Sequence, residues 1–199
     1  MTIRTAVIRR SAAPALLVSL ILALLSGCAT TPPNECQVQA AESGRIDLAT
    51  HYHRASPFLA FGPLPRGMLA QATVYRVNVN RDEIRPCEYL KIHKELYLRR
   101  DPYADLTFTE TREFYAQDGT LIASHSESLG QNLRASGFYT ATTLLPIPPG
   151  APAGNYLIVS KLFFHRRGYD RSVRLARAEV TFTIEPRHSG ATATPSSRR

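Results

Sequence analysis

Acidic side chains offer this chain its most direct route to catalysis. Two carboxylates across a concave site could hydrolyse a glycosidic bond, and the acids to consider first are Asp101, Asp105, Glu110 and Glu113. All four stand in or beside strand-like segments, so we favour solvated strand edges as their setting. The sequence has no Gly-x-Ser-x-Gly, no His-Glu-x-x-His and no phosphate-cradling glycine loop. We therefore expect no enzyme, with a hydrolase or carbohydrate-active protein as an alternative.

Two histidines could bind a metal ion. His51 and His53 stand at i and i+2, where an extended segment would put both imidazoles on one face. They could hold a metal together with a third ligand from elsewhere in the chain. Exposed loop polarity explains the pair equally well, so we expect neither a metal nor any other cofactor.

The first of the three cysteines, Cys28, follows an apolar run. That run, Ala12–Leu25, has 14 residues and is preceded by Arg4, Arg9 and Arg10, which is the layout of a secretory signal peptide. A helix needs about 20 apolar residues to span a bilayer, so a permanent transmembrane segment is the poorer interpretation.

The end of this run, Leu25-Ser26-Gly27-Cys28, resembles the lipobox of bacterial lipoproteins. The resemblance implies that the Cys28 thiol takes a diacylglyceryl group, that cleavage falls just before it, and that palmitate or a similar acid acylates the new amino group. Two or more acyl chains hold a soluble domain at a membrane for long times. Ala29 follows, where Asp would imply retention at the inner membrane by enterobacterial rules. We expect a periplasm-facing, lipid-anchored protein of the outer membrane; an ordinary signal peptide with a chance cysteine is the alternative.

The other two cysteines, Cys36 and Cys87, remain as a pair in an exported chain, where an oxidising compartment favours a disulfide. Closing a loop of about 50 residues would stabilise the fold by roughly 4 kcal/mol in the chain-entropy estimate. A metal pair and two free thiols are the alternatives. No CxxC or His-x3-His spacing accompanies them, so a metal is disfavoured.

The chain is expected to have four parts: a signal peptide at 1–27, a flexible linker at 28–35, a single domain at 36–186 and a disordered tail at 187–199. The formal net charge of +8 falls to +2 for the body once the six arginines of the signal peptide and tail are set aside. A nucleic-acid binder concentrates its cations on the folded surface. We therefore expect no nucleic acid as a partner.

Alternation of apolar and polar residues dominates the domain and predicts strands. Asp118-Gly119 separates two of them and favours the tight turn of a hairpin. A small helix is possible between Glu35 and Leu48. We expect an all-β fold, a single antiparallel two-sheet β-sandwich of about seven strands. The expected strands are Gln71–Asn80, Glu88–Arg99, Leu106–Ala116, Leu121–Ser128, Ser136–Leu145, Asn155–His165 and Ser172–Glu185.

A proline-rich crossing, PIPPGAPAG, connects two of these strands. The sequence of Gly-Phe-Tyr, an apolar strand, Pro-x-Pro, then Pro-Ala-Gly-Asn-Tyr and another apolar strand resembles a corner of immunoglobulin-like, macroglobulin-like and fibronectin-like modules. The resemblance covers about a third of the domain and implies that Tyr156 anchors the corner. It implies no activity.

A run of aromatic and charged residues near the C-terminus is a possible interaction surface for an acidic partner, because arginine and tyrosine are common interface anchors. The residues are Phe164, His165, Arg166, Arg167, Tyr169 and Arg171. An exposed strand end and loop is the alternative. A second segment, Ser56–Met68, is apolar and proline-rich, and we expect it to cover the sandwich rather than to form an exposed binding patch.

Together these observations predict a lipid-anchored, non-enzymatic binding or structural module of the bacterial cell envelope. Its expected partners are the membrane, through the lipid, and an envelope protein. The alternative is an accessory subunit of a larger envelope or secretion assembly.

Overall fold

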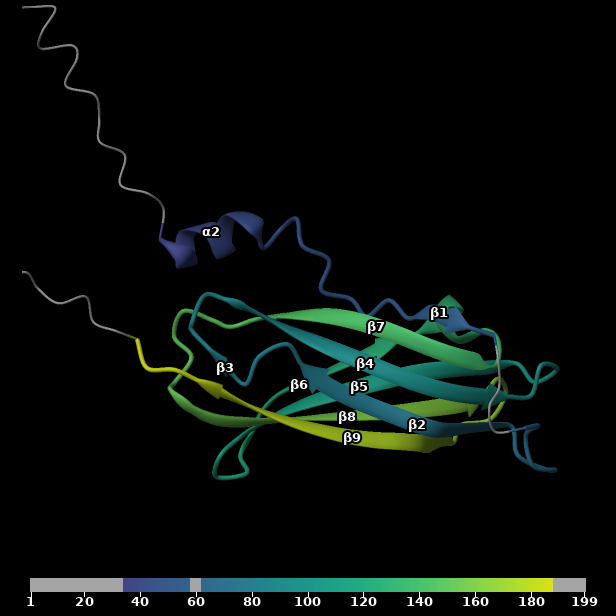
Figure 1. Ribbon diagram of the computed structural model, residues 1–199. Helices are drawn as coiled ribbons and strands as arrows, with labels where there is room; N and C mark the ends of the chain where they lie inside the picture. Colours follow the sequence, from purple (N-terminus) through teal and green to yellow (C-terminus); the bar gives the residue numbers. More distant parts are fainter. Residues whose placement is uncertain (1–33, 58–61, 188–199) are drawn as a thin grey trace, which may run out of the picture. The chain divides into compact units, whose positions relative to one another are not determined.

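Alternating burial forms the strands of this domain. In the strand at Tyr89–Arg100, Leu90, Ile92, Leu96 and Leu98 are fully buried on one face, while the residues of opposite parity from Lys91 to Tyr97 are more exposed. The computed structural model describes residues 34–57 and 62–187, and there the chain folds into two packed β-sheets (Figure 1). The expected signal peptide, Cys28 and nearly all of the tail lie outside the described residues.

The two sheets have four and five strands. The first has the order β1-β7-β4-β2 and the second the order β3-β9-β8-β5-β6. The strands are β1 His53–Ser56, β2 Ala70–Val79, β3 Glu83–Ile84, β4 Tyr89–Arg100, β5 Leu106–Ala116, β6 Leu121–Ser128, β7 Gly137–Pro146, β8 Gly154–Arg166 and β9 Ser172–Ile184, and a 3-10 turn, η1, spans Gly130–Leu133.

The expected all-β sandwich is confirmed, with nine strands in the described residues rather than seven. The two strands that were not predicted from the sequence are β1 and β3. Both are short, so neither shows the alternation that marks the longer strands. It was also wrong to expect only antiparallel pairing, because β3 pairs with β9 in parallel, Glu83 opposite Thr183.

The core between the sheets consists of two apolar clusters. One gathers around Leu96, Phe108 and Leu162, and the other around Ile92 and Ile158. On β4 and β5 the residues between these clusters are charged and buried. The polar layer that they form is described below.

A short helix, α2 (Glu35–Glu42), is preceded by Asn34, which forms a capping box with Gln37: the side chain of each accepts a hydrogen bond from the backbone N–H of the other. Cys36 forms a disulfide with Cys87, with 4.7 Å between their Cα atoms, which confirms the predicted pairing. The Gln39 amide donates to the carbonyl of Glu88 at 3.1 Å. The disulfide and this hydrogen bond hold α2 at one end of the sandwich. No helix in the described part of the chain is long and apolar enough to cross a membrane.

Two tyrosines fix the entries to strands. The Tyr156 hydroxyl donates to the Pro152 carbonyl at 2.7 Å, as the resemblance to immunoglobulin-like corners implied. The Tyr139 hydroxyl makes the same contact with the Ala135 carbonyl at 2.6 Å. The expected hairpin turn is also present, because Gly119 has a φ of 82°.

The segment expected to cover the sandwich is described only in part, because residues 58–61 lie outside the described residues. The Arg99 guanidinium donates to the carbonyls of Gly62 and Pro63, so this part of the segment contacts the end of the sheet. The side chain of Met68 is half-exposed. The prediction of a cover therefore stays a prediction.

Candidate functional site

The loop between β8 and β9 carries most of the predicted interaction surface. The Arg166 guanidinium lies over the Tyr169 ring, 5.1 Å from its centroid, and the Tyr169 side chain is 60% exposed. Arg167 approaches Asp105 at 3.6 Å, and Arg171 is exposed. A planar cation stacked on an exposed ring is a preorganised contact for a carboxylate.

Phe164 does not belong to this surface, which corrects the prediction. Residues of β8 alternate between the core and the outside, so Leu162 and Phe164 both point inward. The Phe164 ring packs on Phe108, with 6.4 Å between the ring centroids. His165, on the other face, is partly exposed.

The fold adds further arginines to the same end of the sandwich. The N-terminal ends of β2, β7 and β9 meet the C-terminal ends of β1 and β8 there, as the strand registers show. Exposed arginines in or beside these strand ends are Arg54, Arg66, Arg134 and Arg174. We name the basic end the set of Arg54, Arg66, Arg134, Arg166, Arg167, Arg171 and Arg174. Arg54, Arg66, Arg134 and Arg174 were not predicted from the sequence, because they lie far from the β8–β9 loop or outside its run of aromatic and charged residues.

Few acids balance the basic end. Asp101, Asp105 and Asp170 are the acids in the adjoining loops. Within residues 34–57 and 62–187, only Arg167 of the seven arginines pairs with a carboxylate, that of Asp105. The basic end therefore presents a net positive surface to solvent.

The opposite end of the sandwich holds an apolar cleft of about 790 Å³. It lies between the β5–β6 hairpin and the proline-rich crossing that joins β7 to β8. On one side β7 pairs with β4 along its whole length, but on the other side β1 pairs only with its start, so in the described structure no strand lies beside Leu145 on that side. We name this space the apolar cleft, lined among others by Phe114, Ile122, Leu145, Ile147, Tyr156 and Phe182.

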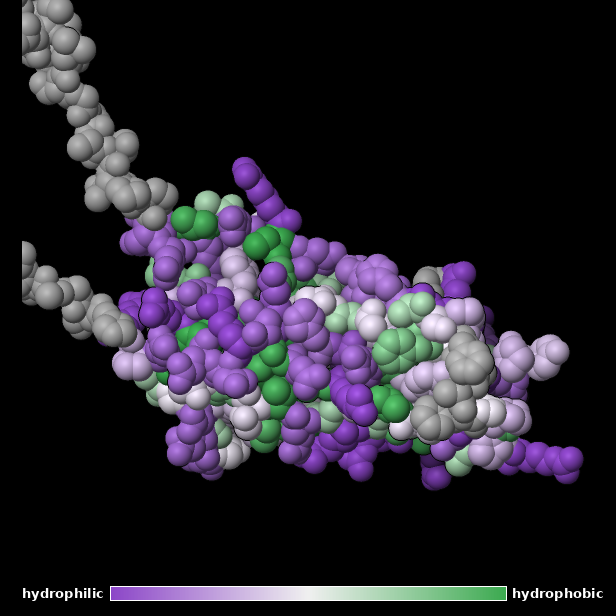
Figure 2. All heavy atoms as spheres, in the orientation of Figure 1, coloured by the Kyte–Doolittle hydropathy of each residue, from purple (hydrophilic) through white to green (hydrophobic). Residues whose placement is uncertain are grey.

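Figure 2 shows one face of the molecule, where hydrophobic side chains form small separated groups among hydrophilic ones. Ile122, in the edge strand β6, is 54% exposed and lines the apolar cleft. The proline-rich crossing was predicted from the sequence, but nothing in the sequence marked it as one wall of a cleft.

A buried polar layer separates the two apolar clusters. The Lys94 ammonium lies 2.6 Å from Glu110, and both side chains have 0% exposure. Lys94 also donates to the Thr50 hydroxyl at 3.1 Å, and the Tyr75 hydroxyl donates to Glu110. Burial lowers the pKa of Lys94, although the Glu110 charge opposes the shift. Burial and the same carboxylate raise the pKa of Tyr75.

The four acids considered for hydrolysis do not share a site. Glu110 is enclosed in the core, which corrects its expected place at a solvated strand edge. Glu113 faces the other side of the sheet, where Lys161 donates to its two oxygens at 2.6 and 2.7 Å. These hydrogen bonds, with one from Tyr115, lower the pKa of Glu113. Asp101 and Asp105 lie at the basic end.

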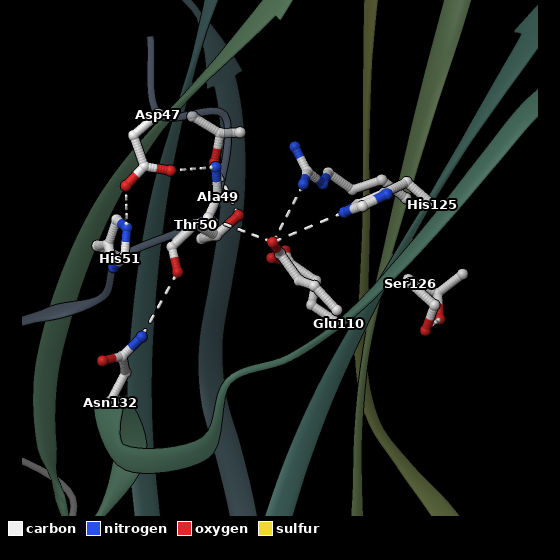
Figure 3. Close-up of polar contacts among 12 residues, drawn as sticks. Asp47, Ala49, Thr50, His51, Glu110, His125, Ser126 and Asn132 are labelled. Carbon is white, nitrogen blue, oxygen red and sulfur yellow. Dashed lines mark hydrogen bonds and ion pairs between the residues drawn. The ribbon is translucent and has the colours of Figure 1, made fainter. Parts of the chain in front are cut away.

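His51 and His53 line a shallow depression with His93 on the outer face of the first sheet. The His51 imidazole is hydrogen-bonded to the Asp47 carboxylate at 2.7 Å, and this carboxylate also accepts a hydrogen bond from the Ala49 amide at 2.9 Å (Figure 3). Among residues 34–57 and 62–187, no three histidines, cysteines or acids are grouped so that they could hold a metal ion.

Comparisons with known proteins do not identify a family. No protein-family model and no curated protein matches the sequence. Solved structures that match include the C-terminal domain of Wzt, with a TM-score of 0.44 and 8% identity over 71% of this chain and 81% of that one. The CARDB domain of the PF1109 protein from Pyrococcus furiosus has a TM-score of 0.35 and 14% identity over 58% and 94%. Spo0M, a sporulation control protein from Bacillus subtilis, has a TM-score of 0.35 and 10% identity over 60% and 51%. None of these likenesses carries a function to this chain.

Proposed function

We propose that this protein is a lipid-anchored, non-enzymatic module of the bacterial cell envelope that binds an acidic face of another envelope protein through its basic end. The observation that carries the proposal is the separation of two features. Figure 1 shows α2 at one end of the sandwich, where the disulfide holds it beside the apolar cleft, and the arginines of the basic end gather at the other end. A chain tethered at its N-terminus would present the basic end away from the membrane.

The anchor rests on the sequence Leu25-Ser26-Gly27-Cys28. Two or more acyl chains on Cys28 would keep the domain at the membrane, and we place it at the outer membrane facing the periplasm. The disulfide between Cys36 and Cys87 supports an oxidising compartment. Labelling with radioactive palmitate tests the anchor: the wild type should take up label and Cys28→Ala should not, and equal labelling of both would contradict it.

The choice of an acidic partner rests on charge. Six of the seven arginines of the basic end form no ion pair with a carboxylate of the described residues, so they can bind a carboxylate of a partner, and Arg166 is already oriented by its stacking on Tyr169. A one-signed surface also steers an oppositely charged partner towards it. The separation of the four candidate acids supports the absence of catalysis.

Site-directed photocrosslinking in intact cells tests the partner. With a photoreactive amino acid at Tyr169, we expect one abundant crosslinked neighbour, and its yield should fall at least several-fold in the variant Arg166→Ser/Arg171→Ser/Arg174→Ser. The matched control is Arg76→Ser/Arg81→Ser/Arg177→Ser, which removes the same charge from exposed arginines that pair with Glu95, Glu88 and Glu179 elsewhere on the sandwich. Equal loss in both variants, or no crosslink, would contradict the proposal. If the neighbour copurifies at fixed stoichiometry, the protein is an accessory subunit of a larger assembly.

A further inference from the structure

We infer that the apolar cleft binds an acyl chain carried by Cys28 of the same molecule. The inference rests on the lipidation of Cys28 proposed above. The acyl chain would occupy the apolar cleft, which is not part of the basic end that we propose to bind a partner.

The lining of the cleft suits hydrocarbon. Its volume of about 790 Å³ lies in the range of small-molecule sites, about 300–1,000 Å³. The rings of Phe114, Tyr156 and Phe182 line it together with Leu145 and Ile147. Most of these side chains also pack in or against the second apolar cluster of the core. A bound acyl chain would therefore extend the core outward rather than sit on a polar surface.

The covalent path from Cys28 to the cleft is short. Asn34, where the described structure begins, is the sixth residue after Cys28, and this stretch spans at most about 20 Å when fully extended. Cys36 is joined to Cys87, and the Cys87 amide donates to the carbonyl of Ile147 at 2.8 Å. Ile147 lines the cleft and also accepts from the Gln39 amide, so the start of the described chain lies beside the cleft and a lipid on Cys28 is within reach of it.

Covalent attachment to the same chain favours this acyl chain, rather than an apolar segment of a partner protein, as the ligand of the cleft. A separate ligand must overcome the loss of its translational and rotational freedom, whereas a tethered one has a local concentration of about millimolar. The acyl chain exchanges one hydrocarbon environment for another at little cost, and the cleft walls lose their contact with water. Any further acyl chains on Cys28 would remain in the bilayer, so the anchor is kept.

A photoreactive lipid tests the inference on the full-length protein. Cells are grown with a palmitate analogue that carries a diazirine and an alkyne, the membranes are irradiated, and the purified protein is mapped by mass spectrometry. We expect crosslinks within the chain to peptides that line the cleft. Ile122→Asn should lower their yield several-fold, because it places an amide in the apolar wall. Leu121→Asn is the matched control, since Leu121 is 51% exposed on the same strand and does not line the cleft.

The outcomes separate the inference from the proposed function. Label that enters the protein and crosslinks only to lipids, to other regions or to another protein overturns the inference and leaves the anchor intact. Equal crosslinking of the two variants also overturns it. If no label enters the protein, the anchor and the inference fail together.

Discussion

Lys94 is a charged residue that is buried in the core of the described domain. It stands in β4 at an inward position between Ile92 and Leu96, so its ammonium is removed from water. Glu110, at 2.6 Å, and the Thr50 hydroxyl, at 3.1 Å, compensate for the lost hydration. A buried ion pair adds little net stability, but the loss of one partner leaves an uncompensated charge.

Lys94→Met should therefore lower the free energy of unfolding by about 3–5 kcal/mol, because it leaves Glu110 buried without a cation. The double variant Lys94→Met/Glu110→Leu should recover most of this loss. Urea denaturation of the soluble Cys28→Ser protein measures both. A single-variant loss below about 1 kcal/mol, or a double variant whose loss is the sum of the two single losses, would contradict the buried pair.

The ion pair of Glu113 with Lys161 makes stability depend on pH. Because the hydrogen bonds from Lys161 lower the pKa of Glu113 in the folded state, this carboxylate stabilises the fold above its unfolded pKa, about 4.3. The contribution is lost as the pH falls through the lowered folded pKa. Glu113→Gln should cost about 1 kcal/mol at pH 7 and nothing near pH 2. Urea denaturation at both pH values checks this, and an equal cost at both would count against it.

At the scale of elements, two tyrosines hold the chain where it enters β7 and β8. Tyr139 is buried, with 2% exposure, and its hydroxyl satisfies the Ala135 carbonyl, whereas the corresponding contact of Tyr156 with Pro152 lies nearer the solvent. Water can replace a lost donor only where it can reach the carbonyl. The two corners are therefore chemically alike but differ in their dependence on the hydroxyl.

Tyr139→Phe should lower the free energy of unfolding by about 1–3 kcal/mol, and Tyr156→Phe by about 0.5–1 kcal/mol. Each substitution removes one hydroxyl and leaves the ring in place, so either variant serves as the control for the other. Thermal unfolding followed by circular dichroism would rank them. A larger loss of unfolding free energy for Tyr156→Phe than for Tyr139→Phe would show that burial does not determine how much each hydroxyl contributes.

At the scale of the whole molecule, the disulfide between Cys36 and Cys87 links the N-terminal segment to the sandwich. It closes a loop across a sequence separation of 51 residues and keeps α2 beside the apolar cleft. Within the described domain, α2 and the basic end then lie at opposite ends of the sandwich. This polarity relates the proposed anchor to the proposed binding surface.

The double variant Cys36→Ser/Cys87→Ser should lose about 4 kcal/mol of stability, because the unfolded chain regains the entropy of an open loop. The strands should be retained, since neither cysteine lies within one. Denaturant unfolding and far-UV circular dichroism measure the two effects. A loss below about 1 kcal/mol, or a collapse of the strand signal in water, would contradict this account.

Most elements of the fold could be predicted from local patterns in the sequence. Seven strands follow from periodicity and the turn at Gly119 from backbone preference, and a small helix was expected between Glu35 and Leu48, where α2 spans Glu35–Glu42. These preferences act over a few residues. The pairing of Cys36 with Cys87 followed from counting the cysteines of an exported chain. The two-residue β3 was missed because its partner, β9, lies about 100 residues away.

The sequence by itself determined the sandwich, its disulfide and the arginine-rich loop after β8. Only the tertiary structure decided that Phe164 and Glu110 are buried, that distant arginines join that loop, and that an apolar cleft opens at the other end. The reason is physical: periodicity tells which residues share a face of a strand, but burial and charge density depend on which strands are neighbours. That neighbourhood is set by contacts between residues far apart in the chain.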